Sequence, residues 1–201
     1  MSSWDKEWAM CHSGKQVFPF ELKLGDIVIE DIAHALAMQC RFNGHVERLY
    51  TVGEHCIRIS DALFRDTGDH RLALRGLLHD AGEAYTGDFT RPVKNSLREV
   101  GQMLKAAEDH NEGVIFQSFG LNPDDAASDA IIKDYDRRII VDEKTALFGP
   151  NKPWDWDLVP LDVPIIGFGG GGCGLYDWHP ERVKAEYLSR FHEHSLGMVR
   201  S

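Results

Sequence analysis

The stretch that decides the fold is Leu77-Leu-His-Asp-Ala-Gly-Glu83. It falls in an expected helix near residues 70–85, where steps of three and four residues return to one face, so His79, Asp80 and Glu83 share a side. An imidazole and two carboxylates are costly to bury unless they are paired, and a divalent cation bound by His79 and Asp80 would pair them. The stretch therefore predicts an inner helix that carries a metal-binding turn.

A His-Asp dipeptide by itself is weak support for a metal site. With 10 histidines among 201 residues, such a pair is expected by chance, so further ligands at suitable places are needed. His55 flanks the buried face of an expected helix near 52–64, and Asp136 lies on the apolar side of a helix that ends near residue 148. The ordinary alternatives are a hydrogen-bonded core histidine and an aspartate paired with a basic residue.

Composition indicates one globular domain that spans residues 1–201. The chain is 43% hydrophobic and 27% charged, and a chain of this length can bury a sizeable core. Its formal charge of −10 argues against a general nucleic-acid binder, because such proteins neutralise phosphates with Lys and Arg. An anionic small molecule would have to meet a few local bases such as Arg41, Arg91 and Lys94.

Cysteine usage and the N-terminus predict a cytoplasmic protein. Cys11, Cys40, Cys56 and Cys173 form no C-x-x-C pair, and we expect them to be reduced, with Cys40 and Cys56 inside helices. The N-terminus has no basic start followed by an apolar run, and no stretch approaches the roughly 18 apolar residues of a membrane span.

Periodicity along the chain predicts an all-α fold with its helical core at about 26–148. A short strand pair is expected around Val17. Helices are expected at 26–40, 52–64, 70–85, 122–148 and about 180–195, and one further long helix is expected after Pro92. Residues 149–178 form a connection rich in Gly, Pro and Trp. Its glycine run at 167–174 lacks the Gly-Lys-Ser/Thr of a phosphate loop, which favours a flap or contact loop.

The order of these polar residues resembles the HD-domain phosphohydrolase superfamily over about residues 26–148. His79-Asp-Ala-Gly-Glu-Ala-Tyr-Thr-Gly-Asp-Phe-Thr-Arg-Pro-Val-Lys94 is similar to the H-D-x-x-E…T-G-D-x-x-x-P-x-K stretch of bacterial 5'-deoxynucleotidases and of phage-type HD nucleotide hydrolases. Asp31-Ile-Ala-His-Ala-Leu36, Cys40-Arg-Phe-Asn-Gly-His45 and Tyr50-Thr-Val-Gly-Glu-His55 are also similar. The glycine-rich tail segment departs from this pattern.

The resemblance implies a role for each motif residue. Two carboxyl groups, on Glu83 and Asp88, would be the acid and base. Arg41 with Lys94 would hold phosphate, while sugar or base would pack on aromatic and small residues. The implied metal ligands are His55, His79, Asp80 and Asp136, and the implied nucleoside contacts are Phe42, Pro92 and Gly44, the last leaving room at the pocket wall.

The expected function is metal-dependent hydrolysis of deoxynucleotides at the phosphorus nearest the sugar, with release of nucleoside and phosphate or tripolyphosphate. One divalent cation, Mn, Co, Mg, Zn or Ni, would serve the reaction. We expect a small nucleotide as substrate, no nucleic-acid or membrane partner, and a homo-oligomer that is at least a dimer. The alternatives are a hydrolase of alarmones or cyclic nucleotides and a non-catalytic nucleotide-sensing module.

Overall fold

The computed structural model describes residues 7–148, 159–161 and 178–200. These residues are mostly helical, and the two strands among them are two residues long, so the predicted all-α class is confirmed. The predicted connection at 149–178, including the glycine run at 167–174, lies almost wholly outside the described residues. No described helix combines the length and the apolar character that crossing a membrane requires.

The N-terminal part confirms a short strand pair near Val17. β1 (Ala9–Met10) pairs antiparallel with β2 (Gln16–Val17), and the chain then enters α1 (Ile29–Met38), whose acidic first turn suits the positive end of a helix. Cys40 was predicted inside this helix, but the helix ends at Met38 and Cys40 is exposed. Among the described cysteines, Cys11, Cys40 and Cys56 are free.

The middle of the chain forms two capped helices. α2 (Val52–Thr67) begins at Thr51, whose hydroxyl accepts from the Glu54 backbone N–H, and it ends at Gly68 in the left-handed conformation. α3 (His70–Leu78) begins at Asp69, whose carboxylate accepts from two backbone N–H groups of the first turn. These caps explain why both helices start where the sequence pattern predicted.

The prediction of one continuous helix over 70–85 was wrong, because the structure interrupts it at the motif. α3 ends at Leu78, and α4 (Glu83–Thr86) follows after a tight turn. Backbone hydrogen bonds in this turn span three residues, such as Glu83 N–H to Asp80 C=O at 3.0 Å. Residues three apart eclipse one another in such a turn, so Asp80 and Glu83 still lie one above the other.

The long helix expected after Pro92 is also divided. α5 (Arg91–Ser96) and α6 (Glu99–Ser118) meet at Arg98, whose φ of 49° cannot continue a right-handed helix. Gly101 permits the chain to fold back, since a Cβ there would lie 2.1 Å from the Lys94 carbonyl oxygen. α5 therefore packs against the backbone of α6.

The two C-terminal helices lie close to the positions predicted from the sequence. α7 (Ala126–Leu147) is capped by Asp125, so it begins four residues after the predicted start at 122, and its C-cap is Phe148, the predicted end. α8 (Pro180–Arg200) begins at the predicted proline and runs five residues beyond the predicted end at 195. Its Val183 and Tyr187 are fully buried.

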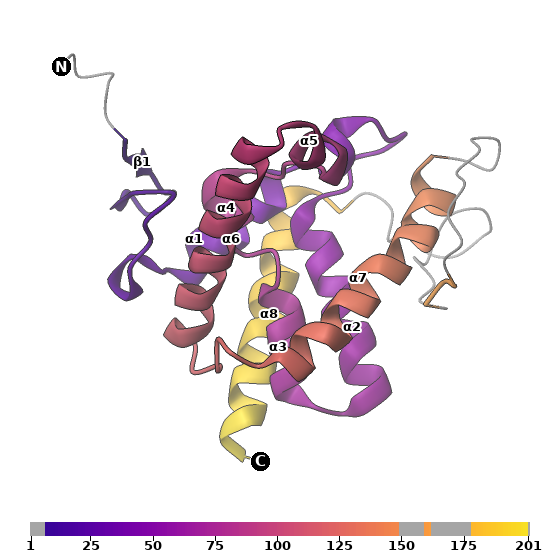
Figure 1. Ribbon diagram of the computed structural model, residues 1–201. Coiled ribbons are helices and arrows are strands. Elements are labelled where there is room, and N and C mark those ends of the chain that lie inside the picture. The colour runs from indigo at the N-terminus through magenta and orange to yellow at the C-terminus, as the bar shows by residue number, and fades with distance from the viewer. Residues whose placement is uncertain (1–6, 149–158, 162–177, 201) are drawn as a thin grey trace.

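The helices pack around α8, which contacts α1, α2 and α3. Figure 1 shows α8 in yellow running through the middle of the view, with the N-terminal strand pair on one side of the bundle and α7 on the other. The main core joins apolar side chains of α1, α2, α3, α6 and α8. A second core, between α2, α3 and α7, holds Ile59, Leu63, Ile132 and Ile139, and it positions the inward face of α7.

Candidate functional site

Three polar side chains from α2 and from the turn after α3 form a group that could hold a metal ion. His55 on α2, and His79 and Asp80 just after α3, each offer a ligand atom within 4.8 Å of the others. The two Nε2 atoms lie 3.3 Å apart, and Asp80 Oδ2 lies 3.3 Å from His79 Nε2 and 3.6 Å from His55 Nε2. Such a convergence of lone pairs and negative charge is what a cation stabilises.

Hydrogen bonds behind the two imidazoles turn their Nε2 atoms toward this group. His79 Nδ1 lies 2.8 Å from the Gly76 carbonyl oxygen, which can only accept, so Nδ1 carries the hydrogen. His55 Nδ1 lies 2.6 Å from a carboxylate oxygen of Glu143, which fixes the same tautomer. With a hydrogen on Nδ1 alone, each ring would present an Nε2 lone pair, as a metal ligand must.

Asp136, the predicted fourth ligand, lies beside His55. Its Oδ1 is 3.3 Å from His55 Nε2, and its Oδ2 is 3.8 Å from the Arg91 guanidinium. Asp134, two residues earlier on α7, is exposed and pairs with Arg138. The structure therefore brings Asp136 to the group and turns Asp134 away from it.

Electrostatic interactions within the cluster favour a protonated His79 when no cation is bound. Burial by itself lowers the pKa of His79, but the adjacent Asp80 carboxylate outweighs it and raises this pKa well above its ordinary value. Burial likewise opposes ionisation of Asp80 and Asp136, yet the histidines lower both pKa values, that of Asp136 to about 2. A proton on His79 thus balances the carboxylates, and a divalent cation could take its place.

A cavity of about 550 Å³ opens beside the cluster, a volume within the usual range for small-molecule sites. It is bounded by the turn after α1, the motif turn, the loop between α4 and α5, α5 itself and α7. The residues that line it are Arg41, Phe42, Asn43, His45, Asp80, Glu83, Asp88, Phe89, Thr90, Arg91, Pro92, Lys94, Asn95, Asp136, Ile140 and Phe148. His55 and His79 lie behind this wall.

Two predicted acid-base groups, Glu83 and Asp88, line this cavity. Burial raises the pKa of Glu83, and the nearby carboxylates of Asp80 and Asp88 raise it further, to about 10. Burial also raises the pKa of Asp88, against the opposing effect of Arg41 and Lys94. A pair of carboxyl groups in this setting holds a proton near neutral pH, which is the property of a general acid.

Both predicted phosphate ligands, Arg41 and Lys94, line the cavity and come from different elements. Arg41 Nη1 lies 3.4 Å from Asp80 Oδ2, and Arg41 Nη2 lies 3.5 Å from Glu143 Oε2. Lys94 Nζ lies 2.8 Å from a carboxylate oxygen of Glu108 on α6. Burial lowers the pKa of Arg41, but its carboxylate neighbours more than offset this, so the side chain stays charged.

The predicted nucleoside contacts divide into two groups. Phe42 and Pro92 line the cavity, and Phe42 meets Phe148 edge to face with ring centroids 5.2 Å apart. Gly44 does not line it, and a Cβ added there would meet nothing within 4 Å. Its φ of +73° indicates that this glycine serves the turn, and the structure does not bring it to the pocket wall.

Sequence reasoning missed the site role of Glu143. Glu143 is not among the predicted site residues, yet it is fully buried and contacts His55, Arg41 and the Tyr50 hydroxyl, the last at 2.9 Å. Burial raises the pKa of Glu143, but Arg41 and His55 outweigh it and keep the carboxyl ionised. A charged residue on an apolar helix face, seven residues after Asp136, was the available signal.

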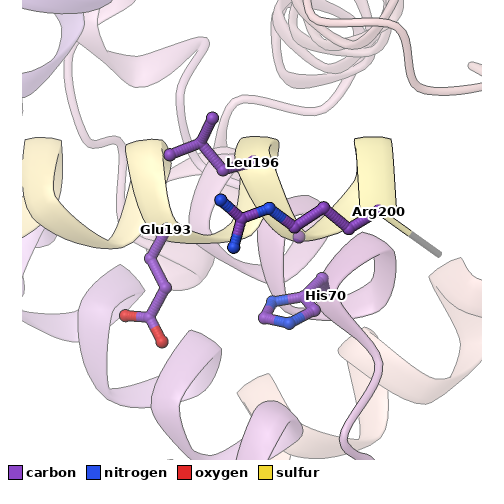
Figure 2. A pocket seen from close by; sticks show the side chains of 5 residues that line it. His70, Glu193, Leu196 and Arg200 are labelled. Atoms are coloured by element: carbon purple, nitrogen blue, oxygen red, sulfur yellow. The ribbon is translucent and has the colours of Figure 1, made fainter.

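A second pocket lies at the far end of α8, away from the cluster. It is lined by His70, Glu193, Leu196, Gly197 and Arg200. Figure 2 shows His70 and Glu193 beside this end of α8, with the Arg200 side chain running back along the helix. Within the described ranges, the only group of three or more His, Cys, Asp or Glu side chains suited to a metal is the one around His55.

Comparisons with known proteins find relatives of this chain, two of which are uncharacterized proteins. No family model matches it. It is 35% identical over 111 residues to the uncharacterized protein YfdR of Escherichia coli strain K12, a match that covers 55% of this chain and 57% of YfdR. It is 32% identical over 120 residues to an uncharacterized protein of Rhodobacter capsulatus, covering 58% of this chain and 60% of that protein. The chain thus spans less than two thirds of the length of these curated relatives.

Proposed function

We propose that this protein is a metal-dependent phosphohydrolase of the HD type that acts on deoxynucleotides. The observation that carries the proposal is the convergence of His55, His79 and Asp80 at the wall of a cavity that also holds two carboxyl groups with raised pKa values. Asp136 would complete the ligand set. Imidazoles with carboxylates suit a borderline or hard divalent cation and leave coordination positions open for substrate.

The residues around the cavity support separate chemical roles in phosphoryl transfer. A divalent cation here would polarise a phosphoryl oxygen and lower the pKa of water. Glu83 would orient the attacking water, since its carboxyl lies one turn from Asp80. Asp88 would donate a proton to the departing sugar oxygen, which is otherwise a poor leaving group.

Positive charge in the cavity supports a phosphate as the reacting group. Arg41 and Lys94 reach the cavity from different elements, and a guanidinium and an ammonium can each hydrogen-bond phosphate oxygens as their negative charge grows. Both cations are already held by carboxylates, Asp80 and Glu108 respectively. They are therefore preorganised, and binding a phosphate would cost little side-chain ordering.

The arrangement favours attack on the phosphorus nearest the sugar. The aromatic pair of Phe42 and Phe148 offers an apolar surface for the nucleoside within the same cavity as Asp80, so the sugar-phosphate junction would fall beside the cluster. A monophosphate would give nucleoside and orthophosphate, and a triphosphate would give nucleoside and tripolyphosphate. Crowding by Phe42 at the 2' position would favour the deoxy sugar.

The proposal is tested by incubating the purified protein with Mn²⁺, Co²⁺, Mg²⁺, Zn²⁺ or Ni²⁺ and a panel of ribo- and deoxynucleotides, followed by chromatography. We expect deoxynucleoside as the first organic product with at least one cation, and none with a chelator. Nucleoside diphosphate or pyrophosphate as the early product would contradict attack at the innermost phosphorus. Hydrolysis confined to alarmones or cyclic nucleotides would favour that class of HD hydrolase.

A matched variant separates catalysis from binding. Glu83→Gln should keep cation and nucleotide binding, because Glu83 is not in the ligand group, while turnover should fall by roughly two to four orders of magnitude, the usual range for a general acid or base. Nucleotide binding without turnover in the wild-type protein, with every cation tried, would support a sensing module.

A further inference from the structure

Glu143 is a buried carboxylate that the proposed reaction does not use directly. It lies on α7 two turns after Asp136, so the two side chains share a helix face, and its side chain is 0% exposed. A buried carboxylate costs several kcal/mol unless hydrogen-bonding and charged partners satisfy it. Its partners therefore indicate why the chain keeps a charge at this position.

Three side chains from three parts of the fold meet on this carboxylate. His55 Nδ1 on α2 donates to Oε1 at 2.6 Å, and the Tyr50 hydroxyl donates to the same oxygen at 2.9 Å. Arg41, in the turn after α1, approaches Oε2 at 3.5 Å. Each oxygen of Glu143 thus serves a different side of the site.

The first oxygen acts on the metal-binding group. With its hydrogen on Nδ1, the His55 ring leaves a lone pair on Nε2, the atom that lies 3.3 Å from His79 Nε2 and 3.3 Å from Asp136 Oδ1. The second oxygen acts on the cavity, because the guanidinium that it holds also pairs with Asp80 at 3.4 Å. Glu143 thus links His55 to Arg41 through its two carboxylate oxygens.

We propose that Glu143 is a positioning residue shared by the metal-binding group and the phosphate-binding side of the cavity. It fixes the tautomer of His55 and holds Arg41 over Asp80. This inference rests on the proposed function, since it requires a cation between His55, His79 and Asp80. A carboxylate behind a ligating histidine commonly changes metal affinity by about 10–100-fold.

Glu143→Gln is the informative substitution because it keeps the shape of the side chain and leaves a single acceptor oxygen. With that oxygen toward His55, the amide NH₂ faces Arg41, which can only donate. With the NH₂ toward His55, the ring must move its hydrogen to Nε2 and loses the lone pair that binds metal. Either orientation breaks one of the two links.

Tyr50→Phe is the matched control. It removes the hydroxyl that donates to the same carboxylate oxygen and leaves the links to His55 and Arg41 in place. Each variant gives up one buried polar contact of the Glu143 side chain, so each should be less stable than wild type. Only Glu143→Gln should change the affinity of the site for the cation or for phosphate.

The first measurement is calorimetric binding of Mn²⁺ to the metal-free protein, followed by binding of inorganic phosphate to the Mn²⁺-loaded protein. We expect Glu143→Gln to bind Mn²⁺ about 10–100-fold more weakly than wild type, or to retain Mn²⁺ and bind phosphate at least about tenfold more weakly. Tyr50→Phe should match wild type in both. Equal Mn²⁺ and phosphate affinities in Glu143→Gln and wild type overturn the inference and leave the proposed function standing.

The second measurement needs no folded variant of Glu143. In metal-free wild-type protein labelled with ¹⁵N-histidine, the His55 ring should show its hydrogen on Nδ1, as assigned by the loss of that signal in His55→Gln. A neutral His55 ring with its hydrogen on Nε2 and none on Nδ1 overturns the inference whatever the variants do. Wild-type protein that binds none of the divalent cations removes the proposed function and the inference together.

Discussion

Glu112 places another carboxyl group behind the metal-binding turn, on α6. Burial raises its pKa, and although His79 lowers it, the carboxylates of Asp129 and Asp80 contribute to a value of about 7, against an ordinary 4.5. A raised pKa means that the folded protein binds this proton more tightly than the unfolded chain does. Its stabilising effect is therefore complete below about pH 4.5 and is lost as the pH rises through about 7.

Glu112→Gln should accordingly stabilise the metal-free protein at alkaline pH. We expect a gain of about 1–3 kcal/mol at pH 8, because the variant need not bury an ionised carboxylate, and no gain at pH 4.5. Thermal unfolding followed by circular dichroism at the two pH values measures the difference. Glu21→Gln, at an exposed position, is the control, and an equal shift in both variants at pH 8 would argue against the raised pKa.

At the scale of elements, the contact between α5 and α6 shapes one wall of the cavity. α5 carries Pro92 and Lys94 into that wall, and it packs where a Cβ on Gly101 would lie 2.1 Å from the Lys94 carbonyl oxygen. The Lys94 carbonyl belongs to the backbone of α5, so it cannot rotate away from an added Cβ as the end of a flexible side chain could. The position of α5 thus depends on a glycine in the first turns of α6.

Gly101→Ala should therefore separate the two helices. We expect a loss of about 1–3 kcal/mol in stability, the usual cost of overpacking, together with weaker binding of inorganic phosphate to the metal-loaded protein because Lys94 moves with α5. Calorimetric titration and thermal unfolding measure the two effects.

Gly113→Ala on the same helix is the matched control for this substitution. A Cβ there would lie 3.7 Å from Pro123 Cβ, an ordinary contact, so the higher helix propensity of Ala should make the variant equal to or up to about 1 kcal/mol more stable than wild type. If Gly101→Ala behaves like Gly113→Ala, then α5 does not lie as close to α6 in solution as in the structure.

At the scale of the whole molecule, α8 joins the N-terminal helices into one bundle, and its far end depends on a histidine pair. His194 is 1% exposed, and its Nδ1 lies 3.1 Å from Nδ1 of His70 at the start of α3. Gly197 lets this contact form, because a Cβ there would lie 2.3 Å from the His70 ring. His70 of this pair lines the pocket shown in Figure 2.

Acid should loosen this end of the bundle. Burial lowers the pKa of His194 below its ordinary 6.5, with His70 and Arg190 acting in the same direction and Glu193 and Asp61 opposing them. A depressed histidine pKa means that the unfolded chain binds the proton more tightly, so stability is lost as the pH falls below about 6.5. His194→Gln should therefore lose less stability than wild type between pH 7 and pH 5.

The expected difference is about 1 kcal/mol, or about 2–4 °C in Tm for a chain of this length. Thermal unfolding of wild type, His194→Gln and the exposed-site control His192→Gln at both pH values measures it. An identical pH dependence in wild type and His194→Gln would show that the buried histidine does not couple the docking of α8 to pH.

The amino-acid sequence by itself determined the helical class and most helix positions. Apolar spacing of three and four residues is a local property, and so are the caps at Thr51, Asp69 and Gly68, which explains why α2 and the start of α3 were predictable. Residue chemistry also singled out His55, His79, Asp80 and Asp136, because imidazoles and carboxylates on inward faces need partners.

Only the tertiary structure decided where the helices break and which faces meet. The turn between α3 and α4 and the corner at Arg98 depend on contacts with other elements, such as the approach of Lys94 to Gly101, and periodicity within one segment does not contain them. The role of Glu143 was hidden for the same reason. A helical pattern shows that a carboxylate faces inward, but its partners come from α2 and from the turn after α1, far away in the sequence.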